Sequence, residues 1–348
     1  MDGAAVLRLL LVAFPLAACG AKLPPDDAAL PRLQILPGSL TVSGLSSGGY
    51  MATQFQVAYS RAVAGAGVIA AGPWFCAEGV PTRALNDCLA GEAAGPDDIR
   101  LVAIAVASGE AGVIDEPAAL ADDRVWVLHG TRDRTTGAAV TDSLVRFYHA
   151  FVPAERIVYE TQVPVGHGFP TAAAGIACEN SGAPWVNNCG YDAAGRILGH
   201  LYDGLRKPGE TAGGELREFG QSRYRAGAAG DSLDARGLLF VPADCAAGSP
   251  CRLHVAFHGC GQGIATIGRE FAEVAGYARW ADANRIVVLY PQAAPSRILP
   301  FNPKGCWDWW GYSGANYASR DGLQLRAVRK MVEALGAAVP VARQTDGQ

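Results

Sequence analysis

The stretch VSGLSSGGYMATQ, residues 42–54, places two serines between glycines where an apolar run meets a helix-like segment. Its centre, GLSSG at residues 44–48, has the form G-x-S-x-G. This pattern suits a sharp strand-to-helix turn, because glycines let backbone approach closely and the central serine hydroxyl stays exposed. The context agrees, since residues 40–45 predict a strand and residues 49–60 a helix. We predict Ser46 as a nucleophile; the alternative is a Gly/Ser turn without chemistry.

A nucleophilic serine needs a histidine to take its proton and a carboxylate to orient that histidine. Asp133 lies in a Gly-containing loop after the apolar run at residues 125–129. His167 lies between two glycines in a loop after the run at residues 156–162. We therefore predict Asp133 as the orienting acid and His167 as the general base.

Other acids and histidines compete for these two roles. Asp123 and Asp142 are the weaker candidates for the acid. His258 precedes a Gly-Cys turn typical of oxyanion loops, which favours a positioning role. We expect core, surface or positioning roles for the five remaining histidines: His129, His149, His200, His254 and His258.

The composition and the order of apolar runs indicate one soluble α/β domain. Of 348 residues, 50% are hydrophobic and 18% charged, with a formal net charge of −4. No Lys/Arg cluster is present, so nucleic acid is not an expected partner. Alternating strand and helix patterns predict a mostly parallel sheet with helices on both faces, within residues 38–340. The expected strands are 40–45, 67–71, 125–129, 156–162, 238–242, 253–258 and 286–290, and the expected helices are 49–60, 141–150, 193–205, 267–284 and 322–335.

The N-terminus indicates export. Within residues 1–19, Arg8 precedes the apolar run 9–18, which is too short to span a bilayer. The segment LAAC, ending at Cys19, resembles a bacterial lipoprotein signal, in which the cysteine is lipidated. The alternative is an ordinary secretory signal with a chance cysteine. Residues 20–37, with four prolines, predict a flexible tether. We expect a secreted, periplasmic or membrane-anchored protein.

Cysteine usage supports export. Setting Cys19 aside, eight of the nine cysteines remain, an even number that favours disulfides. Zinc is the alternative, but no CxxC or Cys/His cluster occurs, and we expect no metal or organic cofactor. Spacing leaves the pairing open, because eight cysteines allow 105 connectivities. Three couples lie close in sequence and two cysteines remain: Cys76 with Cys88, Cys178 with Cys189, Cys245 with Cys251, and then Cys260 and Cys306.

The order Ser, Asp, His agrees with that of α/β hydrolases. One segment departs from their layout. The His-Gly loop that supplies the second oxyanion amide should precede the nucleophile, yet the matching segment 253–260 follows it by about two hundred residues. The strand at 286–290 also has the character of an early strand. We infer a circular permutation, in which the first strands of the usual sheet stand at the C-terminal end.

With these residues in view, the chain resembles poly(3-hydroxybutyrate) depolymerases of the single-domain, circularly permuted α/β-hydrolase type, known from secreted fungal and bacterial members. The resemblance runs from about residue 40 to about residue 335. Six segments carry it: VSGLSSGGYMATQFQVAYS, LHGTRDRTT, VGHGFPT, LHVAFHGCGQG, VVLYPQA and NPKGCWDWWGY. The family's pattern lacks a lipoprotein signal, so a lipid anchor is a departure from it.

The resemblance implies a triad of Ser46, Asp133 and His167, with oxyanion amides from Ser47 and Cys260. It also implies four disulfides: Cys76–Cys88, Cys178–Cys189, Cys245–Cys251 and Cys260–Cys306.

The segment CWDWWGY, residues 306–312, holds four aromatic side chains. Core packing is one explanation, and a cleft for an apolar polyester chain is the other. By the resemblance Trp307 lines that cleft, and we also predict Tyr50 as a substrate contact.

The expected activity is a monomeric serine esterase that cleaves a short-side-chain polyhydroxyalkanoate or its oligomers. Two alternatives remain open. One is an exported esterase that removes acetyl or feruloyl groups from polysaccharide, and the other is a non-catalytic lipoprotein that binds polymer or a partner.

Overall fold

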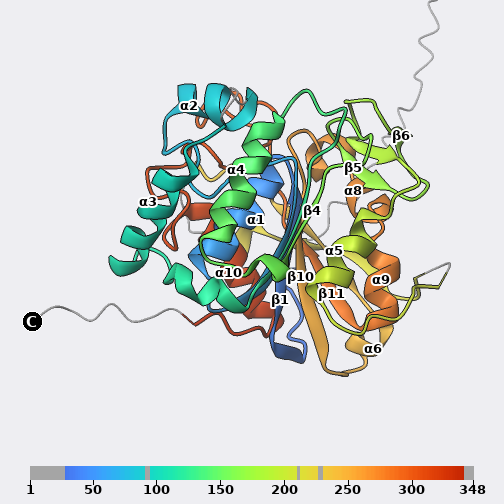
Figure 1. The fold of residues 1–348 in the computed structure, drawn as a ribbon. Helices are drawn as coiled ribbons and strands as arrows, with labels where there is room; N and C mark the ends of the chain where they lie inside the picture. Colours follow the sequence, from blue (N-terminus) through green and yellow to red (C-terminus); the bar gives the residue numbers. More distant parts are fainter. Residues whose placement is uncertain (1–27, 91–94, 210–211, 226–229, 341–348) are drawn as a thin grey trace, which may run out of the picture.

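An eight-stranded sheet runs through the protein, and helices cover both of its faces (Figure 1). The computed structural model describes residues 28–90, 95–209, 212–225 and 230–340. Neighbouring strands are parallel, except that β9 is antiparallel to both β11 and β8. The predicted α/β fold with a mostly parallel sheet is confirmed. In spatial order the strands are β4 (Ile157–Glu160), β3 (Arg124–Leu128), β2 (Val63–Ile69), β1 (Ile35–Leu45), β10 (Cys251–Phe257), β11 (Ile286–Tyr290), β9 (Arg236–Val241) and β8 (Glu215–Gly220).

The central strand is β1, which pairs with β2 on one side and with β10 on the other. Leu40, Val42 and Leu45 in β1 are at most 2% exposed. Such burial on both faces is typical of parallel strands, and it explains why continuous apolar runs predicted most of them. Strand β8 was not predicted, because its sequence ELREFG carries three charges at the sheet edge. The carboxyl ends of parallel strands share one edge of a sheet, so the loops after β1, β3, β4 and β10 meet there.

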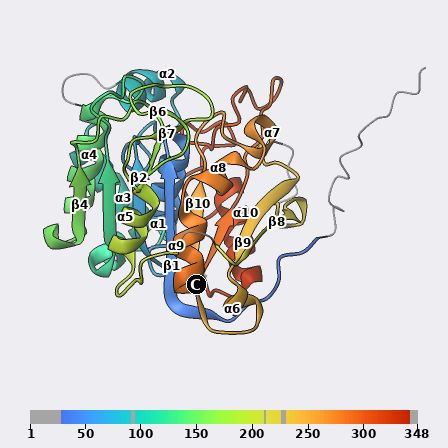
Figure 2. The same cartoon turned by 90° about the vertical axis from the view of Figure 1, so that its right-hand side faces the viewer.

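Two layers of helices enclose the sheet (Figures 1 and 2). Each layer packs on its own apolar core, and the sheet separates the two cores. On one face lie α1 (Ser47–Ala58), α3 (Asp98–Glu110), α4 (Ala138–His149) and α10 (Leu323–Leu335), and on the other lie α5 (Ala193–Leu201), α8 (Glu270–Val274) and α9 (Tyr277–Asn284). The shorter elements are α2 (Pro81–Leu85), α6 (Ala243–Ala246), α7 (Ile264–Ile267), the π-helix η1 (Asn86–Ala90), the 3₁₀ helices η2 (Pro117–Asp122), η3 (Ala154–Arg156) and η4 (Ser222–Tyr224), and a small sheet of β5 (Phe169–Thr171), β7 (Val186–Asn188) and β6 (Ile176–Ala177).

The prediction of a single helix over residues 267–284 was wrong. The segment forms the end of α7, then α8 and α9, with breaks at Gly268 and Gly276. Both glycines have positive φ, +64° and +97°, a backbone conformation that ends a right-handed helix. Apolar periodicity continued across the breaks, because all three short helices pack on the same core.

The described part of the expected tether is packed on the domain. Leu30 is 7% exposed, and its amide donates to the hydroxyl of Tyr224 at 2.9 Å. The amide of Leu33 donates to the carbonyl of Leu335, also at 2.9 Å, and β1 already begins at Ile35. Apolar residues between the prolines find partners on the core, which the proline count did not indicate. Residues 1–27, including Cys19 and the predicted export signal, lie outside the described residues.

The four disulfides that the resemblance implies are all present: Cys76–Cys88, Cys178–Cys189, Cys245–Cys251 and Cys260–Cys306. Disulfides at this density are typical of exported proteins. Within the described ranges, no helix combines the length and the apolar character that a bilayer span requires.

Candidate active site

Ser46 stands at a strained turn between β1 and α1. Its φ of 55° and ψ of −122° lie outside the region that L-residues favour. A non-glycine residue with such a backbone costs on the order of 1–3 kcal/mol and is found mainly at functional sites. The amide of Ser46 donates to the carbonyl of Ile69 at 2.9 Å, which holds the turn on the end of β2. Ser46 is partly exposed, whereas Leu45 and Ser47 on either side are buried.

The flanking glycines are required by close backbone contacts. A Cβ on Gly44 would lie 2.1 Å from the carbonyl oxygen of Gly48. A Cβ on Gly48 would lie 2.4 Å from the carbonyl oxygens of both Phe257 and His258. The first turn of α1 therefore rests directly on the end of β10, where Gly48 lies against His258, two residues before Cys260.

His167 and Asp133, which the sequence predicted as general base and orienting acid, lie in direct contact. Nδ1 of His167 lies 2.8 Å from Oδ2 of Asp133, and the two side chains are 8% and 1% exposed. The other carboxylate oxygen of Asp133 accepts the amides of Thr135 and Thr136 at 2.8 and 3.0 Å. Burial by itself raises the pKa of Asp133, but the hydrogen bond and charge of His167 and these two amides outweigh it and lower the pKa. The lowered pKa favours the carboxylate form of Asp133, which can accept a proton on Nδ1 of His167.

The loops that carry this pair run side by side. The amides of Thr131 and Arg132 donate to the carbonyls of Val163 and Val165 at 2.9 and 3.2 Å. The amide of His167 donates to Oγ of Ser181 at 2.8 Å. These contacts fix the acid loop after β3 against the histidine loop after β4, so the pair does not depend on side-chain contacts alone.

The two histidines of β10 and its loop have no free ring nitrogen for a base. His258 has Nδ1 2.7 Å from the carbonyl of Gly259, and its Nε2 accepts the amide of Ala293 at 3.0 Å. His254 lies 2.7 Å from the hydroxyls of both Thr41 and Ser43. Burial lowers the pKa of His254 to about 3 and that of His258 to about 4, although the Gly259 carbonyl opposes the second shift.

The pair of Ser43 and His254 is not a second nucleophilic site. Both side chains are completely buried, within β1 and β10. Ser43 also lies 2.6 Å from the hydroxyl of Tyr277, which completes an internal polar network. The network satisfies polar groups inside the sheet, because a buried hydroxyl without a partner would destabilise the fold.

Of the other three histidines, two have structural partners and one is exposed. His129 and His200 lie 3.0 Å from the carbonyls of Thr136 and Arg156 respectively, and His149 is exposed at the end of α4.

Neither rival acid is bonded to His167. Oδ2 of Asp123 accepts Nε2–H of Gln56 at 2.7 Å, and Asp142 accepts the hydroxyl of Tyr159 at 2.8 Å. Asp133 is therefore the acid that the described structure joins to a histidine.

The geometry around Ser47 and Cys260 suits an oxyanion site. Ser47 is the first residue of α1, and amides in the first turn of a helix have no intrahelical partner. Across the described ranges, the amide of Cys260 donates to no protein acceptor. Its neighbours are both fixed: the amide of Gly259 donates to Oε1 of Gln262 at 2.6 Å, and that of Gly261 to the carbonyl of Lys304 at 2.7 Å.

The aromatic segment after Cys306 packs against this site. Trp307 is fully buried, with ring centroids 5.2 Å from Phe257 and 5.5 Å from His258. Its Nε1–H is buried without a partner in the described part of the chain. Tyr50 is 3% exposed and stacks on Trp309 at 5.0 Å. The predicted substrate contacts Trp307 and Tyr50 therefore present little or no surface here, and their roles stay predictions.

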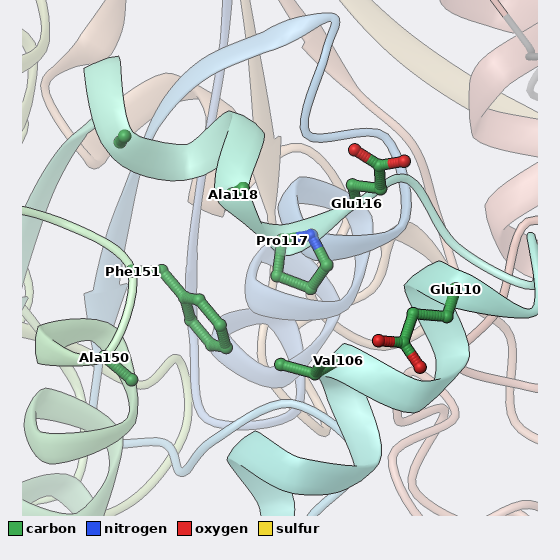
Figure 3. Close-up of a pocket in the computed structure, with 8 residues that line it drawn as sticks. Val106, Glu110, Glu116, Pro117, Ala118, Ala150 and Phe151 are labelled. Atoms are coloured by element: carbon green, nitrogen blue, oxygen red, sulfur yellow. The ribbon is translucent and has the colours of Figure 1, made fainter.

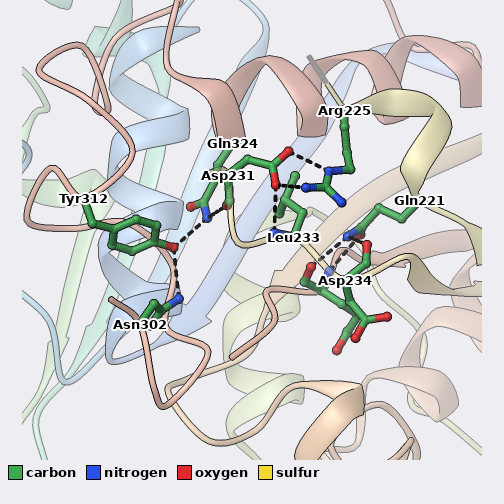
Figure 4. Close-up of polar contacts among 9 residues, drawn as sticks. Gln221, Arg225, Asp231, Leu233, Asp234, Asn302, Tyr312 and Gln324 are labelled. Carbon is green, nitrogen blue, oxygen red and sulfur yellow. Dashed lines mark hydrogen bonds and ion pairs between the residues drawn. The ribbon is translucent and has the colours of Figure 1, made fainter. Parts of the chain in front are cut away.

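A polar network that the sequence did not reveal holds the aromatic segment in place. The Asp308 carboxylate accepts the amides of Trp310, Gly311, Tyr312 and Ser313 at 2.7–3.2 Å. Nε2 of Gln324 donates to the carbonyl of Asp231 and to the hydroxyl of Tyr312 (Figure 4). Asp231 in turn pairs with Arg225, and Asn302 reaches the same tyrosine hydroxyl (Figure 4). No local pattern could have revealed it, because Arg225, Asp231 and Gln324 are distant from the tryptophans in sequence.

Two open pockets are distinct from the triad itself. A pocket of about 430 Å³ lies between α3, η2 and the end of α4, with Val106, Pro117 and Phe151 in its wall (Figure 3). None of the predicted site residues lines it. A second pocket of about 400 Å³ lies beside the His167–Asp133 pair and is lined partly by Arg132 and Arg134. Among the described residues, no group of three His, Cys, Asp or Glu side chains is arranged to hold a metal ion.

The curated proteins to which the chain is similar are named for the same activity. No model of a protein family matches the chain. A poly(3-hydroxybutyrate) depolymerase of Delftia acidovorans is 39% identical over 332 residues, which is 94% of this chain but 65% of that protein. A polyhydroxybutyrate depolymerase of Talaromyces funiculosus is 37% identical over 316 residues, 86% of this chain and 90% of that one.

Solved structures agree with these relatives. The crystal structure of the PHB depolymerase from Penicillium funiculosum superimposes with a TM-score of 0.81 at 35% identity, covering 89% of this chain and 99% of that one. A PHB depolymerase variant complexed with an R3HB trimer gives the same values. By sequence and by fold, the chain belongs to the poly(3-hydroxybutyrate) depolymerase family.

Proposed function

We propose that the chain is a serine esterase that hydrolyses poly(3-hydroxybutyrate), or oligomers of it, through an acyl-enzyme. The observation that carries the proposal is the buried contact of 2.8 Å between His167 and Asp133, on loops at the sheet edge where the strained Ser46 turn lies. Membership of the depolymerase family supports the polyester as substrate.

The mechanism follows from the groups at this edge. Ser46 attacks the ester carbonyl while Nε2 of His167 takes its proton, and Asp133 stabilises the imidazolium that forms. The amides of Ser47 and Cys260 donate to the oxyanion, and each such donor lowers the barrier by about 3–4 kcal/mol. His167 then protonates the leaving hydroxyl of the polymer. Water, activated by His167, hydrolyses the acyl-Ser46 ester and restores the enzyme.

The aromatic segment 306–312 supports a polyester substrate. Trp307 has a buried indole N–H without a partner in the described chain, and unpaired buried donors are rare enough to need an explanation. A small movement of this segment would give that N–H an ester carbonyl to bind. Tyr50, stacked on Trp309, would form the apolar support beneath it.

A circular permutation accounts for the order of the strands. Suppose that β8 to β11 are renumbered as strands 1 to 4 and β1 to β4 as strands 5 to 8. The order of the strands across the sheet, read from β8, is then 1-2-4-3-5-6-7-8. The oxyanion loop then follows strand 3 and the nucleophile follows later in the chain, as in α/β hydrolases. The hydrogen bond from the amide of Leu33 to the carbonyl of Leu335 places the two ends of the described domain side by side. A circular permutation joins two such neighbouring ends and opens the chain at another loop, so this geometry is compatible with one.

Export with a lipid anchor at Cys19 is the proposed cellular setting, and the domain is proposed to act as a monomer. Support comes from the LAAC segment and from the four disulfides. Mass spectrometry of the mature protein tests the anchor, because lipidation adds two or three acyl chains to the new N-terminal cysteine. A mature mass that fits unmodified cleavage would leave an ordinary secretory signal.

The proposed activity is tested by hydrolysis of an amorphous poly(3-hydroxybutyrate) suspension, scored as soluble hydroxybutyrate released. Protein lacking residues 1–19 is compared with its Ser46→Ala variant. Release by the parent and none by the variant is the expected result. If the parent cleaves short acyl esters but releases nothing from the polymer, the triad stands and the substrate assignment fails. Absence of Ser46 labelling by a fluorophosphonate in the disulfide-intact protein would instead favour a non-catalytic binding protein.

A further inference from the structure

Trp185 lies between the catalytic histidine loop and the oxyanion loop. Its ring centroid is 6.3 Å from that of His167, with the two planes nearly perpendicular at 76°. On the other side, a Cβ built on Gly261 would lie 3.0 Å from Nε1 of Trp185. The partly exposed indole thus reaches from the general base to the residue that follows Cys260. No motif in the sequence marked this tryptophan.

The backbone of Trp185 is strained and firmly held. Its φ is 60°, a backbone conformation that is unfavourable for a non-glycine residue. Its carbonyl accepts the amide of Phe169 at 2.8 Å and Nε2–H of Gln262 at 2.9 Å. The same Gln262 side chain accepts the amide of Gly259. One buried glutamine therefore sets the position of Trp185 relative to the oxyanion loop.

The indole N–H of Trp185 is free. Across the described ranges, Nε1–H donates to no protein atom, and an indole nitrogen can only donate. A polyester of short hydroxy acids offers in every repeat unit one carbonyl acceptor and one small apolar branch. An indole, with an apolar face and a single donor, matches both features.

The position beside His167 indicates which part of the substrate this residue meets. His167 must protonate the leaving oxygen, so the repeat unit that departs as the alcohol lies on the histidine side of Ser46. The carbonyl under attack lies on the side of the oxyanion amides. Trp185 borders the histidine side by its ring contact.

We propose that Trp185 binds the repeat unit that supplies the leaving hydroxyl, with the indole against its methyl branch and Nε1–H donated to its carbonyl. The inference rests on the proposed polyester hydrolysis, and it assigns a specificity-determining residue to that site. Trp185 would thus contribute to the hydrolysis of a polymer, whose leaving group is a further repeat unit, but not to the hydrolysis of an ester whose leaving group is a small alcohol.

The test compares Trp185→Phe and Trp185→Ala with the parent in two assays. One is kcat/KM on the (R)-3-hydroxybutyrate trimer, which needs the leaving-unit site. The other is the rate of Ser46 labelling by a small fluorophosphonate, which needs the triad and the oxyanion amides but no leaving repeat unit. Trp280→Phe is the matched control, because it also removes an indole N–H, one that donates to Asp192 at 2.8 Å.

We expect Trp185→Phe to lower trimer kcat/KM about three- to tenfold, the usual effect of losing one hydrogen bond. Trp185→Ala, which also removes the apolar contact, lowers it further. Labelling of all variants stays within about threefold of the parent, and Trp280→Phe is unchanged in both assays.

Equal loss in both assays would overturn the proposal, because Trp185 would then only hold His167 in place. Unchanged trimer hydrolysis in both variants would overturn it as well. A parent that is labelled but does not cleave the trimer would refute the proposed function and, with it, this assignment. The parent protein alone reveals that outcome, so it is distinguishable from a failure of the Trp185 assignment, which only the variants reveal.

Discussion

Cys260 and Cys306 are joined in a disulfide across 46 positions of the sequence. The bond ties the loop after β10 to the aromatic segment, and the amide of Trp307 reaches Oγ of Ser47 at 3.3 Å. The two proposed oxyanion residues, Ser47 and Cys260, are thus connected through one short run of chain. Their spacing depends on this disulfide as well as on the packing of Gly48 against His258.

Removing that disulfide is expected to affect catalysis more than a remote disulfide does. The double variant Cys260→Ala/Cys306→Ala should lose tenfold or more in kcat on a short acyl ester. The active enzyme concentration is taken as the amount of Ser46 that a fluorophosphonate labels. The chain-entropy contribution of the disulfide to stability is about 4 kcal/mol for a loop of this size, so thermal unfolding should shift down as well. The control is Cys245→Ala/Cys251→Ala, which opens a six-residue separation at the start of β10 and should keep its kcat. Equal kcat losses in the two variants would contradict a role for Cys260–Cys306 at the site.

Asp133→Asn is expected to lower kcat by about 10⁴ while the protein stays folded, because the amide cannot stabilise the imidazolium and presents its N–H to the wrong tautomer. Initial rates on a soluble acyl ester measure this. Asp142→Asn is the matched control, since among the described residues its carboxylate accepts only the hydroxyl of Tyr159. If Asp142→Asn lost as much activity as Asp133→Asn, the assignment of the acid would be wrong.

Gly48→Ala is expected to destabilise the protein and abolish activity. Its Cβ would meet two carbonyl oxygens at 2.4 Å and push α1 away from the oxyanion loop. Overpacking of this kind costs about 1–3 kcal/mol or more. Gly199→Ala, in the exposed part of α5 with no atom within 4 Å of the new Cβ, should instead be neutral or stabilise by about 0.5–1 kcal/mol. Urea unfolding of both variants checks the contrast, and an active, stable Gly48→Ala protein would refute the close packing.

Stability should fall as pH rises from about 4 to 8 because of Asp123. Burial raises the pKa of Asp123 from 3.8 to about 8, although the hydrogen bond from Gln56 opposes the shift. The folded state therefore keeps a proton that the unfolded chain releases above about pH 4, and the contribution is lost as pH approaches 8. Each pH unit in this window changes the free energy of unfolding by about 1 kcal/mol.

Asp123→Asn should remove this slope. The measurement is the free energy of unfolding of parent and variant in urea at pH 5, 6, 7 and 8. The difference between them should change steadily in favour of the variant as pH rises, and a constant difference would mean that Asp123 is ionised in the folded protein.

Much of the fold could be read from local pattern. Buried parallel strands are continuous apolar runs, so β3, β10 and β11 were predicted close to their observed limits, whereas β1 begins at Ile35, five residues before its predicted start. The prediction of one helix over residues 267–284 was wrong because apolar periodicity gives no information on the positive φ of Gly268 and Gly276. The prolines before β1 indicated a tether, yet Leu30 and Leu33 are anchored by partners about 190 and 300 residues away in the chain.

The sequence by itself determined the G-x-S-x-G turn between strand and helix, the order of Ser46, Asp133 and His167, and the even set of cysteines, because each depends on residue type and short spacing. Only the tertiary structure decided that His258 and His254 have no free nitrogen, that Trp307 is buried, and that Trp185 stands beside His167. These facts depend on contacts between segments that the sheet brings together from distant parts of the chain. Side-chain burial and hydrogen-bond partners are properties of that packing, and no local pattern encodes them.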